Sequence, residues 1–333
     1  INFGKGERCS PSGFDALYGI STGAYNVANG YRALQNNNKD YIVGVGVYAL
    51  SNNSGDGNTA VGYEALKANA AGERNTASGY KAMTTNTTGG YNAVCGWEAL
   101  TTNTTGSNNA GFGYGALHNN TTASDNTAVG YGGLYYNTTG TKNTACGYQA
   151  LYSNTTADEN TAVGYYALRT NTTGANNVAT GYYALYTNVS GDKNTATGYG
   201  ALYTNTADGN TATGYNAMFD NTDGYDNTAV GKDAMYKNTT GDHNVAVGVN
   251  AFIYNTTASY NTAVGSHALA GTSGQYGAND NVAMGYVTMF NTTTGAGNTA
   301  IGKEAMYTHT VGDYNVALGR QAMKGASDAD NNV

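Results

Sequence analysis

The chain has 333 residues, and charged side chains make up only 11% of them, less than half the share usual in globular domains. Its formal net charge of −7 argues against nucleic acid and anionic membranes as partners, because both are negatively charged and favour basic surfaces. The longest apolar run, residues 41–50, is too short to span a bilayer, so we expect no membrane insertion.

A 17-residue repeat covers almost the whole chain. "NTAVGYYALRTNTTGAN", residues 160–176, is followed directly by "NVATGYYALYTNVSGDK", residues 177–193. The glycine at position 5 of this repeat occurs 19 times, in steps of 17 residues apart from three of 16 and one of 20. The sequence therefore predicts a single repeat array over residues 1–333, with edges at 1–8 and 324–333 and a loop insertion at about 270–280.

Each copy is predicted to form one coil of an all-β parallel β-solenoid, a β-roll of about 19 coils with 17 residues per coil. A copy offers one large apolar residue, at position 9, so only stacked copies can share a core. We expect one short strand in N-T-A-V-G, a second in G-Y-x-A-L-Y-x-N, and a turn in T-T-G. At a strand spacing of about 4.8 Å, the stack would be roughly 90 Å long.

The restrained positions of the repeat have expected places in such a coil. Positions 3 and 5 are almost always Ala and Gly and are expected to face inward, where position 9 fills the same channel. Position 5 is also expected to need a positive φ, which glycine tolerates best. The asparagines at positions 1 and 12 are expected to stack as ladders of side-chain amides, each bonding its neighbours above and below.

The N-x-A-x-G core, with a second small residue three places on, resembles the head repeat of trimeric autotransporter adhesins. N-T-A-V-G-Y-x-A-L-Y-x-N-T-T-G is also similar to arrays in phage tail-fibre proteins, and the resemblance covers all 19 copies. It implies a parallel β-roll, packed as a trimer and held outside a cell or on a virion. The signal, heptad stalk and membrane anchor of complete adhesins are not found here, so we expect a segment of a longer protein.

A stripe of aromatic residues at position 6 is the strongest candidate for surface recognition. Stacked aromatic rings can bind sugars through their faces, and they can equally cover the solenoid edge or pack between chains. The stripe comprises Tyr63, Tyr80, Trp97, Tyr114, Tyr131, Tyr148, Tyr165, Tyr182, Tyr199 and Tyr215.

Position 12 begins the sequon N-x-T or N-x-S in nine copies. In a secreted protein of a glycosylating organism these asparagines would be acceptors on an exposed turn, and otherwise they would form the amide ladder. The nine candidate acceptors are Asn86, Asn103, Asn120, Asn137, Asn154, Asn171, Asn188, Asn238 and Asn255.

Four aspartates, Asp56, Asp192, Asp242 and Asp313, stand in the turn before position 1. Acidic turns in stacked coils can hold Ca²⁺ through oxygen ligands. The calcium-binding roll motif G-G-x-G-x-D is absent, however, and an Asx turn accounts for the same residues. We therefore expect no cofactor, with Ca²⁺ as the alternative.

No catalytic arrangement emerges from the sequence. His118, His243, His267 and His309 occupy four different positions of the repeat, so no two of them stack or have metal-ligand spacing. No glycine-rich stretch has the pattern of a nucleotide-binding loop. We expect no enzymatic activity.

The three cysteines give little redox information. Cys95 and Cys146 share position 4 but lie three coils apart, about 14 Å at the spacing of parallel strands, which is beyond the reach of a disulfide. Cys9 lies several coils further away. We interpret them as small side chains, with contacts between chains as the alternative.

The expected function is that of a non-enzymatic fibrous attachment protein, the shaft or head of an extracellular adhesin or a phage tail fibre. Its place would be outside the cell, at the cell surface or on a virion. One alternative is a self-assembling extracellular filament, with or without a glycan coat, and another is a carbohydrate- or ice-binding solenoid. The expected partners are copies of itself, as a trimer or an end-to-end filament, and cell-surface glycans.

Overall fold

The computed structural model of the chain describes residues 9–19, 22–271, 277–308, 310–325 and 330–332. Regular structure in these residues is entirely β, with nineteen strands of three residues each and no helix. A search of these residues for a long, apolar, membrane-spanning helix accordingly finds none. The chain divides into two compact units, Ile1–Val163 and Gly164–Val333, and the same coil builds both.

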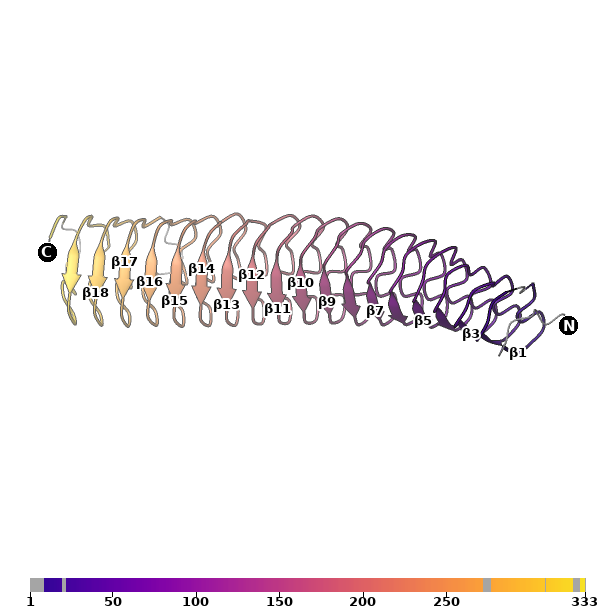
Figure 1. Ribbon diagram of the computed structural model, residues 1–333. Helices are drawn as coiled ribbons and strands as arrows, with labels where there is room; N and C mark the ends of the chain where they lie inside the picture. The colour runs from indigo at the N-terminus through magenta and orange to yellow at the C-terminus, as the bar shows by residue number, and fades with distance from the viewer. Residues whose placement is uncertain (1–8, 20–21, 272–276, 309, 326–329, 333) are drawn as a thin grey trace. The chain divides into compact units, whose positions relative to one another are not determined.

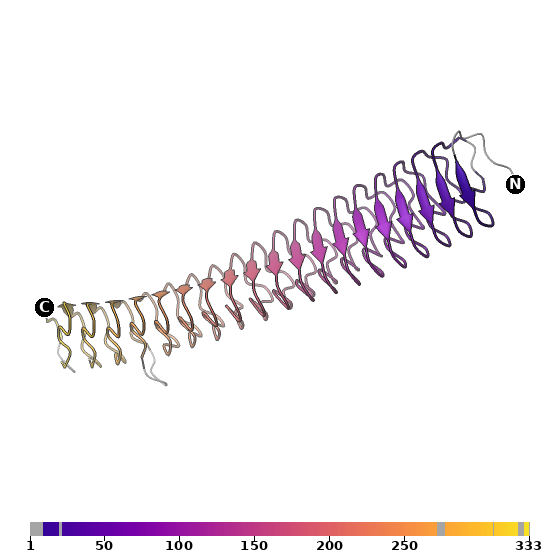
Figure 2. The same cartoon turned by 90° about the horizontal axis from the view of Figure 1, so that it is seen from below.

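The first unit contains ten strands, one per copy of the repeat. Figure 1 shows their arrows side by side and pointing the same way, and Figure 2 shows the same row from below. The strands are β1 (Ser10–Ser12), β2 (Val27–Asn29), β3 (Val43–Val45), β4 (Thr59–Val61), β5 (Thr76–Ser78), β6 (Ala93–Cys95), β7 (Ala110–Phe112), β8 (Thr127–Val129), β9 (Thr144–Cys146) and β10 (Thr161–Val163).

The second unit contains nine strands with the same spacing and direction (Figure 1). They are β11 (Val178–Thr180), β12 (Thr195–Thr197), β13 (Thr211–Thr213), β14 (Thr228–Val230), β15 (Val245–Val247), β16 (Thr262–Val264), β17 (Val282–Met284), β18 (Thr299–Ile301) and β19 (Val316–Leu318).

Successive strands within each unit pair in parallel, with each repeat position over the same position of the next coil. In the first unit Ala60 of β4 pairs with Ala77 of β5, and in the second Ala196 of β12 pairs with Ala212 of β13. This register confirms the expected β-solenoid with one coil per 17-residue repeat, because only that period places alanine over alanine along the stack.

The pairing of β16 with β17 spans the longest copy of the repeat. Thr262, Ala263 and Val264 pair in register with Val282, Ala283 and Met284, although the two strands are 20 residues apart rather than 17. The loop insertion predicted at about 270–280 includes residues 272–276, which lie outside the described residues, as does the predicted N-terminal edge 1–8.

The second strand predicted in each copy is wrong. Positions 6–10 form a turn in which the residues at positions 7 and 9 are left-handed, as at Glu64 with φ 53° and Leu66 with φ 50°. This turn still bonds to both neighbouring coils. The N–H of Glu64 donates to the Val47 carbonyl of the preceding coil at 2.9 Å, and the N–H of Leu66 donates to the Ala82 carbonyl of the next coil at 2.9 Å.

The core is a narrow channel lined by positions 3, 8 and 9. In one typical coil Ala60, Ala65 and Leu66 are all completely buried, so the prediction that position 9 fills the core is confirmed. Position 5 was expected to face the same channel, and this is wrong. Gly62 is half-buried, has φ 138°, and is restricted because an added Cβ would lie 2.3 Å from the carbonyl oxygen of Gly79 in the next coil.

The expected amide ladder is confirmed at position 12. The side chain of Asn86 donates from Nδ2 to Oδ1 of Asn69, one coil back, at 2.6 Å and to the Gly89 carbonyl at 2.8 Å. Position 1 forms a mixed ladder instead. Oδ1 of Asn75 accepts the backbone N–H of Asn92 at 3.0 Å, while its Nδ2 donates to the Gly89 carbonyl at 2.9 Å.

The position-12 ladder differs between the two units. In the first it links every coil from Asn37 to Asn154. In the second, the Oδ1 atoms of Asn188 and Asn238 are buried without a hydrogen-bond partner among the described residues. Asn205, in a copy of 16 residues, directs its amide to Ala207, and Asn255, before the longest copy, directs its amide to Leu269. Changes in copy length therefore interrupt the ladder.

Candidate functional site

The predicted aromatic stripe at position 6 lies on the surface as stacked rings. Tyr114 and Tyr131 stack with ring centroids 4.9 Å apart and planes 5° apart, and Tyr182 and Tyr199 stack at 5.3 Å and 4°. Tyr80 is half-buried, whereas the other members are exposed, up to 50% at Tyr215. The sequence thus located these side chains correctly at the surface.

Stacking determines which part of each ring is available to a ligand. Inside a stack, the faces of a ring such as Tyr199 are turned toward Tyr182 on one side and Tyr215 on the other. A sugar that binds aromatic residues uses ring faces, so the interior of the stack cannot bind one in that way. The exposed stripe can offer ring edges and phenolic hydroxyls, which exchange hydrogen bonds.

A second aromatic row, at position 10, was not recognised from the sequence. In the second unit Tyr186, Tyr203, Phe219 and Tyr236 stack at 5.2, 4.7 and 5.4 Å and are half-buried. A signal was present at position 7, where Gly200 leaves room for this row. An added Cβ there would lie 3.1 Å from the Phe219 ring.

Hydrogen bonds between tyrosines perturb two members of this surface. A hydrogen bond with Tyr166, and then burial, raises the pKa of Tyr165 to about 12. A hydrogen bond with Tyr182, and then burial, raises the pKa of Tyr183 to about 12. Both hydroxyls therefore remain protonated at neutral pH, so neither supplies a phenolate for chemistry there.

The nine sequon asparagines are not on an exposed turn, and that expectation is wrong. Their side chains are at most 3% exposed, because they form the position-12 row inside the coil. Asn120, for example, donates from Nδ2 to Oδ1 of Asn103 at 3.0 Å and to the Ala123 carbonyl at 2.9 Å. Since glycosylation would modify this same buried nitrogen, the folded coil offers the ladder rather than an acceptor.

The aspartates at position 16 link coils to one another. Oδ1 of Asp192 accepts the backbone N–H of Ala175 in the preceding coil at 2.7 Å, and Oδ1 of Asp242 accepts that of Tyr225 at 3.0 Å. Asp56 and Asp313 accept the equivalent N–H groups of Asp40 and Ala296. These bonds run between coils, so the Asx turn expected within a single turn is not what holds these residues.

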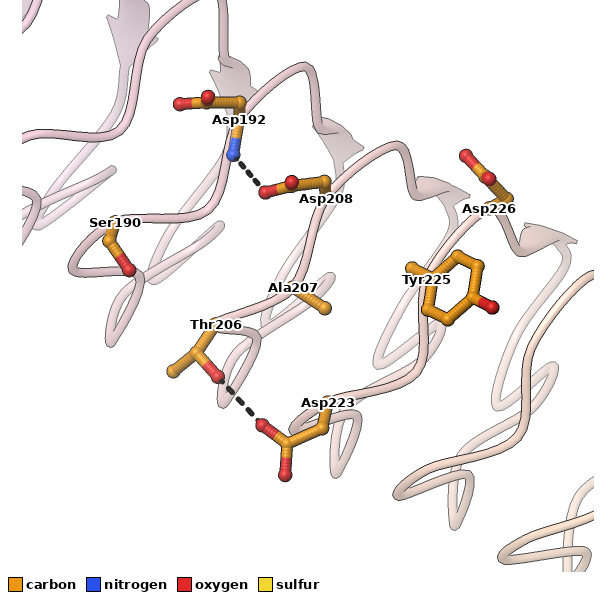
Figure 3. A pocket seen from close by; sticks show the side chains of 8 residues that line it. All are labelled: Ser190, Asp192, Thr206, Ala207, Asp208, Asp223, Tyr225 and Asp226. Atoms are coloured by element: carbon orange, nitrogen blue, oxygen red, sulfur yellow. Dashed lines mark hydrogen bonds between the residues drawn. The ribbon is translucent and has the colours of Figure 1, made fainter.

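The short copy 194–209 creates a hollow in the second unit, with a volume of about 570 Å³. Figure 3 shows the carboxyl groups of Asp192, Asp208, Asp223 and Asp226 around it, and two of them already accept hydrogen bonds. Asp208 accepts the N–H of Asp192 at 2.8 Å, and Asp223 accepts the hydroxyl of Thr206 at 3.3 Å. Within the described residues, no three His, Cys, Asp or Glu side chains are grouped to hold a metal ion.

The remaining reactive side chains are dispersed. Cys9, Cys95 and Cys146 are free thiols, the last two exposed on the outer face of the sheet. Of the histidines that the structure describes, His118 stacks on Tyr135, and His243 stacks on Tyr260. His309 lies outside the described residues.

The outer face of the sheet is a surface whose composition the sequence analysis left unexamined. Positions 2 and 4 of every strand point away from the core, while the alanine between them is buried, as in the exposed–buried–exposed pattern of Val245–Val247. The threonine row at position 2, considered for ice binding, is interrupted by valine in β11, β15, β17 and β19. The alternation of small and β-branched residues in N-T-A-V-G was the available signal.

Together these features define a repeat protein of the parallel β-solenoid class, with side-chain ladders inside and stacked aromatic rows outside. No protein-family model matches the chain, and no curated protein sequence matches it. The adhesin and tail-fibre resemblance therefore rests on the repeat pattern alone.

Proposed function

We propose that this chain is a non-enzymatic fibre segment that spaces and presents an attachment surface outside a cell or on a virion. The observation that carries the proposal is the position-12 ladder of the first unit, in which the same buried amide link recurs from Asn37 to Asn154. Such a coil extends by repetition without changing its cross-section, which suits a spacer.

In this proposal the presented surface is the position-6 stripe, and its target is a cell-surface glycan. Ring edges and hydroxyls of residues such as Tyr182 and Tyr199 would hydrogen-bond to sugar hydroxyls. The repeat of the stripe along the stack supports multivalent contact, in which weak single contacts add up.

Immunogold electron microscopy of the source cells or virions tests this function. The expected result is gold along extracellular or virion-attached fibres. Gold confined to the cell interior would contradict the proposal.

A second candidate is a self-assembling filament in which copies stack end to end. Leu318 at position 4 of β19 is 75% exposed, whereas the equivalent Ile301 of β18 is 38% exposed. A further coil stacked on β19 would cover Leu318, which favours growth at this end. Electron microscopy of the purified chain at rising concentration would show lengthening particles, and particles of constant length would exclude this candidate.

A further inference from the structure

The outer face of β14–β19 in the second unit is an uncharged, largely apolar surface. Positions 2 and 4 of these six strands are all Thr, Val, Met, Ile or Leu. Val230, Val247 and Ile301 are 37–38% exposed although they stand in the middle of the sheet. An exposed apolar surface that continues over six adjacent strands is typical of an interface.

The turns on the two sides of this face carry charges of opposite sign. The turns that enter the strands contain Asp226, Asp242, Asp280 and Asp313. The residue that follows each strand at position 6 is a cation in three copies, Lys232, Lys303 and Arg320, and is never acidic. One edge of the face is therefore acidic and the opposite edge is basic.

The basic edge keeps most of its charge available. Lys232 lies 3.7 Å from Asp233, beyond hydrogen-bond distance, and its side chain is 62% exposed. Lys303 lies 3.7 Å from Glu304, but that carboxylate is hydrogen-bonded to Lys324 and Gln321. On the acidic edge the Asp226 side chain is 57% exposed, with His243 3.9 Å away.

Symmetry decides which partner this pattern fits. When two copies of the face pack with a two-fold axis along the stacking direction, the basic edge of each copy lies opposite the acidic edge of the other. With the axis along the strands, like charges would face each other. The pattern thus selects a second copy of this chain, with parallel stacking directions.

We propose that two copies pair through the outer faces of β14–β19, with parallel stacking directions and sheets about 10 Å apart. Lys232 lies opposite Asp226 of the partner subunit, and Arg320 lies opposite Asp313 of the partner subunit. The pair rests on the proposed function as a self-associating fibre and replaces the trimer implied by the adhesin resemblance.

Sedimentation at micromolar concentration, under reducing conditions because Cys95 and Cys146 are exposed, tests the pair. The native chain is expected at twice its mass of 34.3 kDa. The double variant Val230→Lys, Val247→Lys is expected at the single-chain mass with an unchanged melting temperature, because both side chains are at the surface. Val189→Lys, at a site 45% exposed outside the sheet, is the matched control and should keep the double mass.

Charge reversal tests the orientation. Lys232→Asp and Asp226→Lys are each expected to weaken association by about tenfold or more, and the double variant is expected to restore it. Single reversals that strengthen association, or a double variant no better than the singles, would overturn the parallel pair. A native chain found as a monomer, as a trimer, or only as growing end-to-end particles would overturn the interface itself.

These outcomes are separate from the test of function. A monomer in sedimentation together with gold-labelled fibres would reject only the sheet-face pair. A double-mass species together with gold inside the cell would keep the pair and reject the fibre function.

Discussion

The strand side and the turn side of each coil solve the same problem by different means. On the strand side, three extended residues bond to both neighbouring coils through the parallel ladder, and positions 2 and 4 vary freely among Thr, Val, Ser, Cys and Phe. On the turn side, bonding to both coils depends on left-handed residues at positions 7 and 9, such as Tyr183 and Leu185. The turn side therefore combines the core residue with backbone strain.

This difference shows where the repeat is constrained. A left-handed conformation costs an ordinary residue roughly 1–2 kcal/mol, and this cost recurs at position 9 in every coil. Burial of the Leu or Met side chain and a hydrogen bond to the next coil offset it. Substitutions on the turn side should consequently be more damaging than those on the strand side.

The largest effect is expected for Leu185→Asp, because a charge would enter a channel without a partner. The expected loss of stability is several kcal/mol, roughly 3–5 on the scale of uncompensated buried charges. Val178→Asp in the same copy, at a strand-side position 40% exposed, should change stability by less than about 1 kcal/mol. Melting followed by circular dichroism compares them, and equal melting temperatures would show that the two sides do not differ.

Two glycines of one copy separate steric restriction from conformation. Gly198→Ala should cost about 2–3 kcal/mol, because φ is 131° and the new Cβ would lie 2.3 Å from the carbonyl oxygen of Gly214. Gly200→Ala should cost about 1 kcal/mol, because φ is 60° and its nearest contacts are the side chains of Asn216 and Phe219. Chemical denaturation measures both, and the reverse order would contradict the close approach at position 5.

The amide ladder between the two sides is tested by neighbouring asparagines. Asn120→Ala removes the amide that donates to Asn103 and leaves the Nδ2 of Asn137 without its acceptor, so a loss of about 1–3 kcal/mol is expected. Asn119→Ala, at a half-buried site, is the control and should cost less. Equal unfolding free energies for these variants would mean that the ladder contributes no stability.

The smallest effect concerns pH and is confined to the turn side. The pKa of Tyr165 and that of Tyr183 are each raised to about 12 from an ordinary 10. Their contribution to stability is therefore complete below pH 10 and is lost as the pH rises from 10 to 12. A spectrophotometric titration should show Tyr166→Phe lowering the Tyr165 pKa, whereas the exposed control Tyr314→Phe should leave it unchanged.

The sequence predicted the period, the core position and one ladder because these repeat in register. Ala, Leu and Asn recur at fixed positions, and stacking turns such recurrence directly into contacts. It could not predict the left-handed turn, because Tyr and Leu have no preference for that conformation and only bonds to neighbouring coils stabilise it. The sequons failed for a related reason: N-T-T reads alike whether Asn120 is an exposed acceptor or a buried amide, and burial alone decides.

The most direct test of this account is an NMR measurement of the φ angles of Tyr183 and Leu185 in the folded chain. The account predicts positive values, near the 57° and 50° of the structure. Values near −120°, typical of a parallel strand, would contradict it and restore a coil made of two strands.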